Sequence, residues 1–139
     1  MTPQEMAHIH AAAFHQSRPW VADEFAELLA NRFIHAIGDT RSFALVQVIA
    51  NEAELLTIAT HPDHQRKGLA RKIMVEFHAY ADQAGASRAF LDVASDNDAA
   101  IALYEACGYE ACGTRKRYYL RENGPNVDAI VMECRFHGN

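Results

Sequence analysis

The segment 58–71, IATHPDHQRKGLAR, constrains the fold most strongly, because an apolar strand-like run leads through a short loop into a helical pattern. The first N–H groups of a helix have no intrahelical partner, and the helix dipole places partial positive charge at the same point. A glycine there, Gly68, lets an anion approach the main chain without meeting a Cβ atom. The junction therefore predicts a strand–loop–helix unit that holds a phosphate group.

Basic side chains surround this turn, at Arg66, Lys67, Arg71 and Lys72. Arginine and lysine are the side chains that meet phosphate oxygens in proteins. An amphipathic helix that merely follows a basic loop is the alternative, since one glycine does not exclude it. The patterns G-x-x-x-x-G-K-[ST] and G-x-G-x-x-G are both missing from the sequence, so nucleotide hydrolysis and hydride transfer have no support.

Length and charge indicate one globular unit with few classes of partner. The 139 residues, 50% of them hydrophobic, can enclose one core, so we expect a single domain over residues 1–139. The 13 Lys and Arg against 18 Asp and Glu give a formal net charge of −5. This balance disfavours nucleic acid and anionic membranes as partners and mildly favours basic or amine-bearing substrates.

Targeting, redox and metal signals are weak. No apolar run has the length of a membrane span and the first residues lack the regions of a signal peptide, so a cytoplasmic location is expected. The three cysteines, Cys107, Cys112 and Cys134, lack CxxC spacing, and we expect reduced thiols in or near the core. The histidine pairs 8/10 and 61/64 have no acidic third ligand at a recognised spacing, so no metal is predicted.

Periodicity and turn signals predict the element order ααβββαβαββ, a mixed sheet with helices on its faces, in the α+β class. Thr2, Pro3 and Glu5 form the pattern of a capped helix start. Two of the strands flank a long helix and are expected to be parallel, in a right-handed crossover. The expected elements are a helix from residue 3, a helix around residues 25–29, strands 33–37, 43–50 and 54–60, a helix 68–83, a strand 88–93, a helix 99–106 capped by residue 96 or 97, and strands 109–119 and 129–136 joined by a turn at 121–126.

Two motifs resemble signatures of the GCN5-related N-acetyltransferase (GNAT) superfamily. Residues 65–70, QRKGLA, resemble Q/R-x-x-G-x-G/A, the turn at which family members bind the pyrophosphate of acetyl-CoA. Residues 90–109, FLDVASDNDAAIALYEACGY, resemble L-[ED]-V-x-x-x-N-x-x-A-x-x-L-Y-x-x-x-G-[FY]. Residues 115–119 and 128–132, with Pro19-Trp20 and Phe25, are similar to RimI-type ribosomal-protein alanine N-acetyltransferases. The resemblance spans nearly the whole chain, most densely residues 54–132.

The resemblance implies a GNAT acyl-CoA N-acyltransferase fold with one departure. Family members usually begin with a short strand before the first helix, whereas here the helix signal starts at Thr2. We therefore predict that this edge strand is missing. Its absence would expose the edge of the neighbouring strand. Such an edge either pairs with another chain or is protected by charged side chains that face solvent. The protein is expected to be a monomer or a weak homodimer.

The activity implied is transfer of an acetyl group from acetyl-CoA to a primary amine, foremost the N-terminal α-amine of alanine in a ribosomal protein. The family holds the cofactor where two strands, here ending at Thr60 and Val93, splay apart, so that main-chain groups pair with the pantetheine. Asn97 is expected both to cap its helix and to contact the pantetheine. The implied cofactor-binding residues are Ile58, Ala59, Thr60, Arg66, Lys67, Gly68, Leu69, Ala70, Arg71 and Asn97.

Two residues match the family's catalytic positions. Asp92 stands where RimI-type enzymes carry a glutamate general base and is one methylene shorter, so it is expected to act through water on an amine whose pKa is about 8. The alternative is a carboxylate that caps the following turn or pairs with a neighbouring arginine. Tyr104 matches the tyrosine that protonates the departing thiolate, and the alternative is a packed helical aromatic.

Tyr118 and Tyr119 lie in the expected substrate loop. Because side chains alternate along a strand, one is expected to face the acceptor peptide and the other to pack inward. The acceptor is less determined than the donor: other protein N-termini, lysine or a small amine are alternatives. A non-enzymatic acyl-CoA sensor is a further alternative, which the presence of both Asp92 and Tyr104 argues against.

Overall fold

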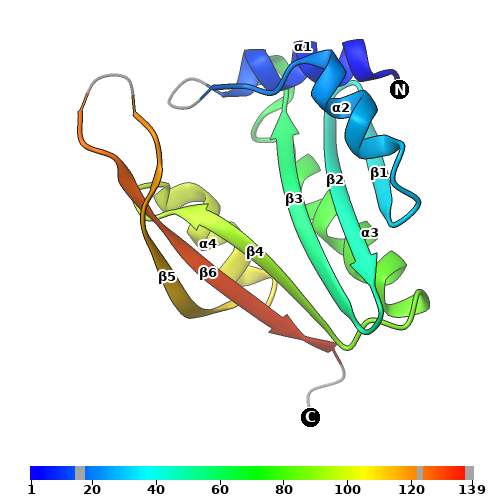
Figure 1. Ribbon diagram of the computed structural model, residues 1–139, viewed down its shortest axis with the longest axis vertical. Coiled ribbons are helices and arrows are strands. Elements are labelled where there is room, and N and C mark those ends of the chain that lie inside the picture. Colours follow the sequence, from blue (N-terminus) through cyan, green and yellow to red (C-terminus); the bar gives the residue numbers. More distant parts are fainter. Residues whose placement is uncertain (15–17, 122–123, 137–139) are drawn as a thin grey trace.

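Six strands form one mixed sheet with four helices on its faces in the computed structural model, which describes residues 1–14, 18–121 and 124–136 (Figure 1). The sheet order is β1-β2-β3-β4-β6-β5. The helices are α1 (Pro3–Ala13), α2 (Ala22–Leu29), α3 (Leu69–Gln83) and α4 (Asp98–Ala106), with a 3₁₀ turn at Pro62–His64; the strands are β1 (Ile34–Asp39), β2 (Ser42–Ile49), β3 (Glu52–Thr60), β4 (Arg88–Ala94), β5 (Glu110–Tyr119) and β6 (Val127–Arg135).

The predicted order ααβββαβαββ and the α+β class are confirmed, and the predicted strand bounds differ from the observed ones by about two residues at most. Part of the turn predicted at 121–126, residues 122–123, lies outside the described residues. No helix in the described ranges is both long and apolar enough to cross a membrane.

The start of α1 follows the predicted cap. The Thr2 hydroxyl accepts a hydrogen bond from the Glu5 N–H at 3.1 Å, and the Glu5 carboxylate accepts one from the Thr2 N–H at 2.8 Å. Hydrogen bonds from Thr2, foremost from its backbone N–H, lower the pKa of Glu5 because they favour the ionised carboxylate. In the described part of the chain no strand precedes α1, so β1 forms the sheet edge as predicted.

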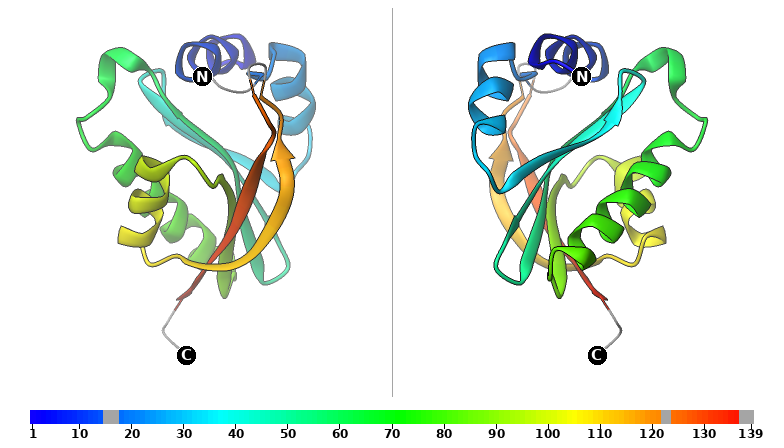
Figure 2. Two further views of the ribbon diagram at one scale, coloured as in Figure 1. Left: turned by 90° about the vertical axis from the view of Figure 1, so that its left-hand side faces the viewer. Right: turned by 90° about the vertical axis from the view of Figure 1, so that its right-hand side faces the viewer.

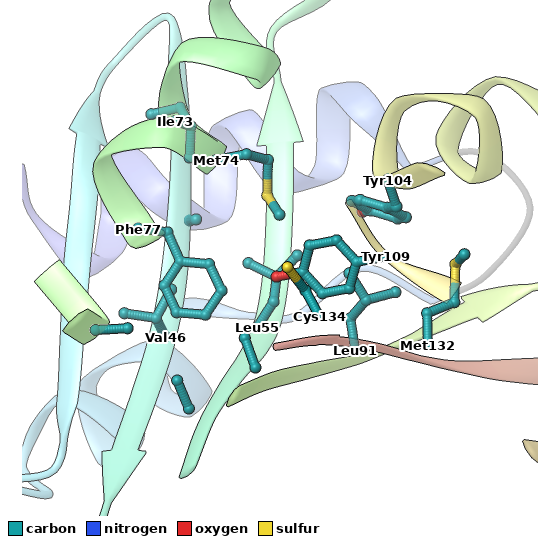
Figure 3. Packing of buried hydrophobic residues seen from close by; sticks show 14 of the residues in the cluster. Val46, Leu55, Ile73, Met74, Phe77, Leu91, Tyr104, Tyr109, Met132 and Cys134 are labelled. Carbon is teal, nitrogen blue, oxygen red and sulfur yellow. The ribbon is translucent and has the colours of Figure 1, made fainter. Parts of the chain in front are cut away.

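The two faces of the sheet have separate hydrophobic clusters. Helices α3 and α4 lie on one face, while α1 and α2 cover β1–β3 on the other (Figure 2). On the first face Met74 and Phe77 of α3 pack with Leu91 of β4 (Figure 3). On the second, Met6 of α1 and Phe25 of α2 pack together with β2 and β3. The site elements are therefore held by two independent cores.

A gap opens in the middle of the sheet. Strands β3 and β4 are parallel, as predicted, but pair only from Glu52–Glu54 to Arg88–Phe90. Beyond Glu54 the two strands diverge, β3 remaining with β2 and β4 with β6 (Figure 1). One edge of β3 over residues 55–60 therefore has no sheet partner among the described residues, which confirms the predicted splay.

A β-bulge in β3 lies beside this gap. Leu45 pairs with Thr57 and Val46 with Leu55, so Leu56 is an extra residue between two register pairs. As a result Leu56 and Thr57, although adjacent, both face α1 and α2: Leu56 packs on that cluster and the Thr57 hydroxyl meets His10. Simple alternation would have put them on opposite faces.

Cys112 differs from the sequence-based expectation. All three cysteines are free, with Cys134 buried and Cys107 half-buried, but Cys112 is exposed. It lies on β5, whose residues are nearly all open to solvent because no helix covers this edge strand. The expectation of a near-core thiol is therefore wrong for Cys112.

His10 of α1 is buried, with 1% of its surface exposed. Its Nε2 lies 3.0 Å from Thr57 Oγ1 and its Nδ1 accepts the Trp20 N–H at 2.9 Å. Burial lowers the pKa of His10 from 6.5 to about 4, while the charges of Glu24 and Arg18 act in opposite directions and change it less. The ring is therefore neutral at physiological pH.

This burial predicts acid sensitivity. The unfolded chain binds a proton at His10 below about pH 6.5 and the folded chain only near pH 4, so stability is full above that window and is lost as the pH falls through it. Between pH 7.5 and 5 the loss through this one group is about 2 kcal/mol. Denaturant titrations of wild type and His10→Phe at several pH values measure the free energy of unfolding. Wild type should lose more stability than the variant as the pH falls, and an equal pH dependence in both proteins would contradict the prediction. The lowered pKa of His78 acts in both proteins and cancels.

Candidate active site

The turn before α3 has an open, uncapped geometry. Gly68 is the N-cap of α3, with φ 76°, and no side chain caps the helix. A Cβ built on Gly68 would meet no heavy atom within 4 Å, so the main chain faces open space. The N–H groups of Leu69, Ala70 and Arg71 begin the helix there, which is the arrangement that binds a phosphate.

The charges predicted around this turn are exposed. Arg66, Lys67 and Arg71 are all open to solvent, and Arg66 itself adopts a left-handed backbone with φ 65°. Lys67 Nζ lies 3.2 Å from His64 Nδ1, and the Gln65 side chain donates to the Thr60 carbonyl at 3.3 Å. The loop is thus folded back on the end of β3 with its cations at the surface.

Three more of the predicted cofactor residues, Ile58, Ala59 and Thr60, lie on β3 beside the gap. Ile58 and Ala59 pack against opposite clusters, so their side chains anchor β3 while its free edge stays open. The Thr60 hydroxyl lies 2.8 Å from that of Ser42. Asn97 caps α4, accepting the Ala100 N–H at 3.2 Å, which confirms the predicted cap. Their contact with a cofactor stays a prediction.

A groove of about 660 Å³ lies on the face that carries α1 and α2. Carboxylates and aromatic rings share its walls, an environment suited to a cationic amine beside an apolar chain. It is lined by Trp20, Glu24, Glu27, Leu28, Glu54, Leu55, Leu56, Asp92, Tyr118 and Tyr119. The strands β3 and β4 and the end of β5 thus contribute to one site.

Asp92 and Glu54 stand on the same face of the sheet, on the two strands that diverge. Asp92 accepts a hydrogen bond from Arg115 Nε at 3.2 Å, so the arginine pairing considered as an alternative is present. Glu54 has no salt bridge in the described part of the chain. Partial burial raises the pKa of Glu54, the negative charge of Asp92 raises it further, and Arg115 opposes them.

Sequence reasoning missed Glu54. Its signal is a lone acidic residue inside the mostly apolar stretch 53–59, which runs into the turn before α3. A raised carboxyl pKa makes a stronger base near neutral pH, and such shifts are frequent at reactive sites. Glu54 is therefore a second candidate, beside Asp92, for the proton acceptor of the groove.

Tyr104 lies on the other face of the sheet, reaching from α4 into the α3/α4 cluster (Figure 3). Its ring meets that of Tyr109 edge-on, with centroids 6.1 Å apart. Burial raises the pKa of Tyr104 well above its ordinary value, and Tyr119 and Cys107 add to the effect. Tyr104 is therefore a protonated phenol. Its ring is packed among core residues, as the alternative interpretation proposed.

Tyr118 and Tyr119 both line the groove, which contradicts the expected alternation. The register of β5 shifts between Arg115 and Tyr119, and Arg117 has φ 50°. This irregularity turns two consecutive side chains to one side, with ring centroids 5.2 Å apart. Burial and the charge of Asp92 raise the pKa of Tyr119 to about 12.

A family model described as Acetyltransferase (GNAT) family matches residues 5–109 of the chain. The protein belongs to the GNAT acetyltransferase family. The match includes the uncapped turn at Gly68 and both diverging strands. The protein is accordingly an acetyl-CoA-dependent N-acetyltransferase, as its two motifs implied. In the described ranges no three His, Cys, Asp or Glu side chains are placed to hold a metal ion.

Two named GNAT relatives and one solved structure resemble the chain over most of its length. The [ribosomal protein bS18]-alanine N-acetyltransferase of Escherichia coli K12 is 36% identical over 118 residues, covering 82% of this chain and 79% of the relative. The N-alpha-acetyltransferase RimI of Mycobacterium tuberculosis is 33% identical over 138 residues, covering 93% and 84%. A crystal structure of the Escherichia coli ribosomal-protein-S18-alanine N-acetyltransferase superposes with a TM-score of 0.86 at 32% identity, covering 96% and 86%. The GNAT fold and the RimI resemblance are thereby confirmed.

Proposed function

We propose that this GNAT protein acetylates the α-amine of a protein N-terminus, with the N-terminal alanine of a ribosomal protein as its foremost acceptor. The observation that carries the proposal is the groove at the β3–β4 gap, whose walls include the carboxylates of Glu54 and Asp92 beside aromatic rings. The acceptor class is supported by the relatives, two of which are named for α-amine acetylation, one of them on ribosomal protein bS18.

The turn and the gap fit acetyl-CoA. The α3 N-terminus with Gly68 offers free N–H groups to the pyrophosphate, and Arg66, Lys67 and Arg71 stand beside them. The free edge of β3 over residues 58–60 offers main-chain groups to the pantetheine. Bound there, acetyl-CoA supplies an acetyl group activated as a thioester.

Glu54 takes the proton of the incoming amine in this proposal. An α-ammonium group has a pKa of about 8, so at neutral pH it must lose a proton before its nitrogen can react. Asp92 is paired with Arg115, whereas Glu54 has the raised pKa and no salt bridge. Asp92 assists by its negative charge, which both attracts the ammonium group and raises the pKa of Glu54.

Tyr104 acts from the opposite face of the sheet in this proposal. It lies on the α3/α4 side of the sheet, and the groove lies on the α1/α2 side, so donor and acceptor reach the gap from opposite faces. The protonated phenol stabilises the thiolate that leaves by donating a hydrogen bond to it. Its raised pKa makes complete proton transfer unfavourable in the free protein, so its contribution is modest.

Tyr104→Phe is therefore expected to lower kcat by about tenfold, below the usual range for general acids, because a thiolate needs little assistance. The acetyl-CoA Kd, measured by calorimetry, is expected to stay within about twofold, since the ring and its packing are kept. A loss of acetyl-CoA affinity equal to the loss of kcat would assign Tyr104 to binding instead.

A peptide panel followed by release of free thiol tests the function. The panel holds a peptide beginning with Ala, the same peptide with a blocked N-terminus, a blocked peptide with an internal lysine, and a polyamine. Turnover of the free α-amine alone supports the proposal, and turnover of lysine or polyamine alone replaces the acceptor. Acetyl-CoA binding without turnover of any member would identify an acyl-CoA sensor.

A further inference from the structure

The hydrogen bonds of His10 have a fixed direction. A backbone N–H can only donate, so Nδ1 of His10 must be the acceptor for Trp20 at 2.9 Å. In the neutral ring the hydrogen then resides on Nε2, which donates to the Thr57 hydroxyl at 3.0 Å. One buried side chain thus joins α1 to two segments distant in sequence, the α1–α2 loop and β3.

Three aromatic rings enclose His10 and exclude water from these bonds. The rings of Phe14 and Trp20 stack on it, with centroids at 3.8 Å and 5.2 Å, and Phe25 meets it edge-on at 5.4 Å. Hydrogen bonds in such a dry surrounding are strong, and a lost partner leaves a buried polar group unpaired. The ring therefore fixes its partners in one arrangement.

One partner lines the groove and the other is adjacent to a lining residue. Trp20 is one of its walls, and Thr57 follows Leu56, which is another. The loop is also tied to α2 by Arg18, which donates two hydrogen bonds to Glu24, at 2.7 Å and 2.9 Å, but this exposed pair does not reach the strand beside the gap. The buried His10 contacts are consequently the firmest connection between the Trp20 wall and the strand beside the gap.

We propose that His10 is a positioning residue for the acceptor: by accepting the Trp20 N–H and donating to Thr57, it holds the Trp20 wall at a fixed distance from the β3–β4 gap where the amine reacts. This inference rests on the proposed function for its kinetic consequence. His10 does not line the groove, so it acts through the two groups that it bonds, Trp20 and Thr57.

His10→Phe tests the proposal, since it keeps an aromatic ring in the cage and removes both hydrogen bonds. Amide hydrogen exchange at Trp20 in the free protein is expected to accelerate by about tenfold, the effect of one lost hydrogen bond. The KM for the Ala peptide is expected to rise by about tenfold, with kcat and the acetyl-CoA KM within about twofold. A purely structural role would lower the active fraction, and hence kcat, without changing the peptide KM.

Two further variants keep the test decisive. Thr57→Val preserves shape and leaves the Trp20 bond in place, and a smaller rise in peptide KM, about threefold, is expected; it also decides the matter should His10→Phe not fold. His78→Phe is the matched control, because His78 is likewise partly buried and bonded to one hydroxyl, that of Tyr109 at 2.8 Å, but on the α3/α4 face. It is expected to change neither Trp20 exchange nor the peptide KM.

The readouts separate this inference from the proposed function. If wild type turns over no peptide, the proposed function fails. Amide exchange at Trp20 still reports on its hydrogen bond with His10. Since Trp20 is the single tryptophan of the chain, its fluorescence also gives a peptide Kd without turnover. Unchanged Trp20 exchange in His10→Phe, or an unchanged peptide KM in both variants, would overturn the inference.

Discussion

Glu54→Gln is expected to lower kcat with an N-terminal peptide by about 100-fold, the usual contribution of a positioned general base. Glutamine has the shape of glutamate but cannot take a proton from the amine. The wild-type rate is expected to fall as the pH is lowered through the raised pKa of Glu54, because protonation removes the base. Steady-state kinetics across pH measure both effects, and the variant should lack this acid limb.

Two variants at neighbouring positions show which carboxylate acts as the base. Asp92→Asn removes the charge that raises the pKa of Glu54, so the acid limb should move to lower pH. Glu52→Gln, two residues away on the same strand and paired with Arg88 outside the groove, is the matched control and should keep wild-type kcat. If Glu54→Gln keeps wild-type kcat while Asp92→Asn loses it, the base is Asp92, as first predicted from the sequence.

Gly68→Val is expected to raise the Kd for acetyl-CoA by about 100-fold, the equivalent of one or two lost charge-assisted hydrogen bonds. The new side chain would meet no protein atom, since no heavy atom lies within 4 Å of its Cβ. It would occupy instead the space through which the phosphate approaches the N–H groups of α3. Calorimetry with acetyl-CoA and with CoA measures the loss.

Gly85→Val separates this effect from backbone strain. Gly85 follows the other end of α3, also has a left-handed backbone, with φ 94°, and also has open space beyond a Cβ. Both variants should lose about 1–2 kcal/mol of stability, because L side chains disfavour this conformation. Only Gly68→Val should weaken acetyl-CoA binding, and equal Kd values in the two variants would refute the phosphate role of the turn.

Local rules were enough to predict the elements and the glycine turn before α3. The cap at Thr2, the glycine at the start of α3 and the cap of α4 by Asn97 depend on neighbouring residues, and each agrees with the structure. The widening between β3 and β4 was predicted only through the family resemblance. No pattern in the residues themselves marks Glu54 as the point where pairing ends.

The errors arise from features that the local pattern of one strand does not contain. Period-two alternation placed Tyr118 and Tyr119 on opposite sides, whereas the register shift in β5 turns both into the groove. The acidic Glu54 escaped notice because its role depends on Asp92, a residue on another strand. Interactions of this kind arise from tertiary packing, which the composition of one strand does not contain.

The extra residue at Leu56 makes strand length a constraint on any redesign of this enzyme. Deleting one residue from 55–57 would restore even alternation and rotate the preceding half of β3 by one face relative to the rest. The Glu54 carboxylate would then point into the hydrophobic core beneath α3, and an apolar side chain would take its place in the groove. Libraries that vary side chains here are therefore far safer than libraries that vary chain length.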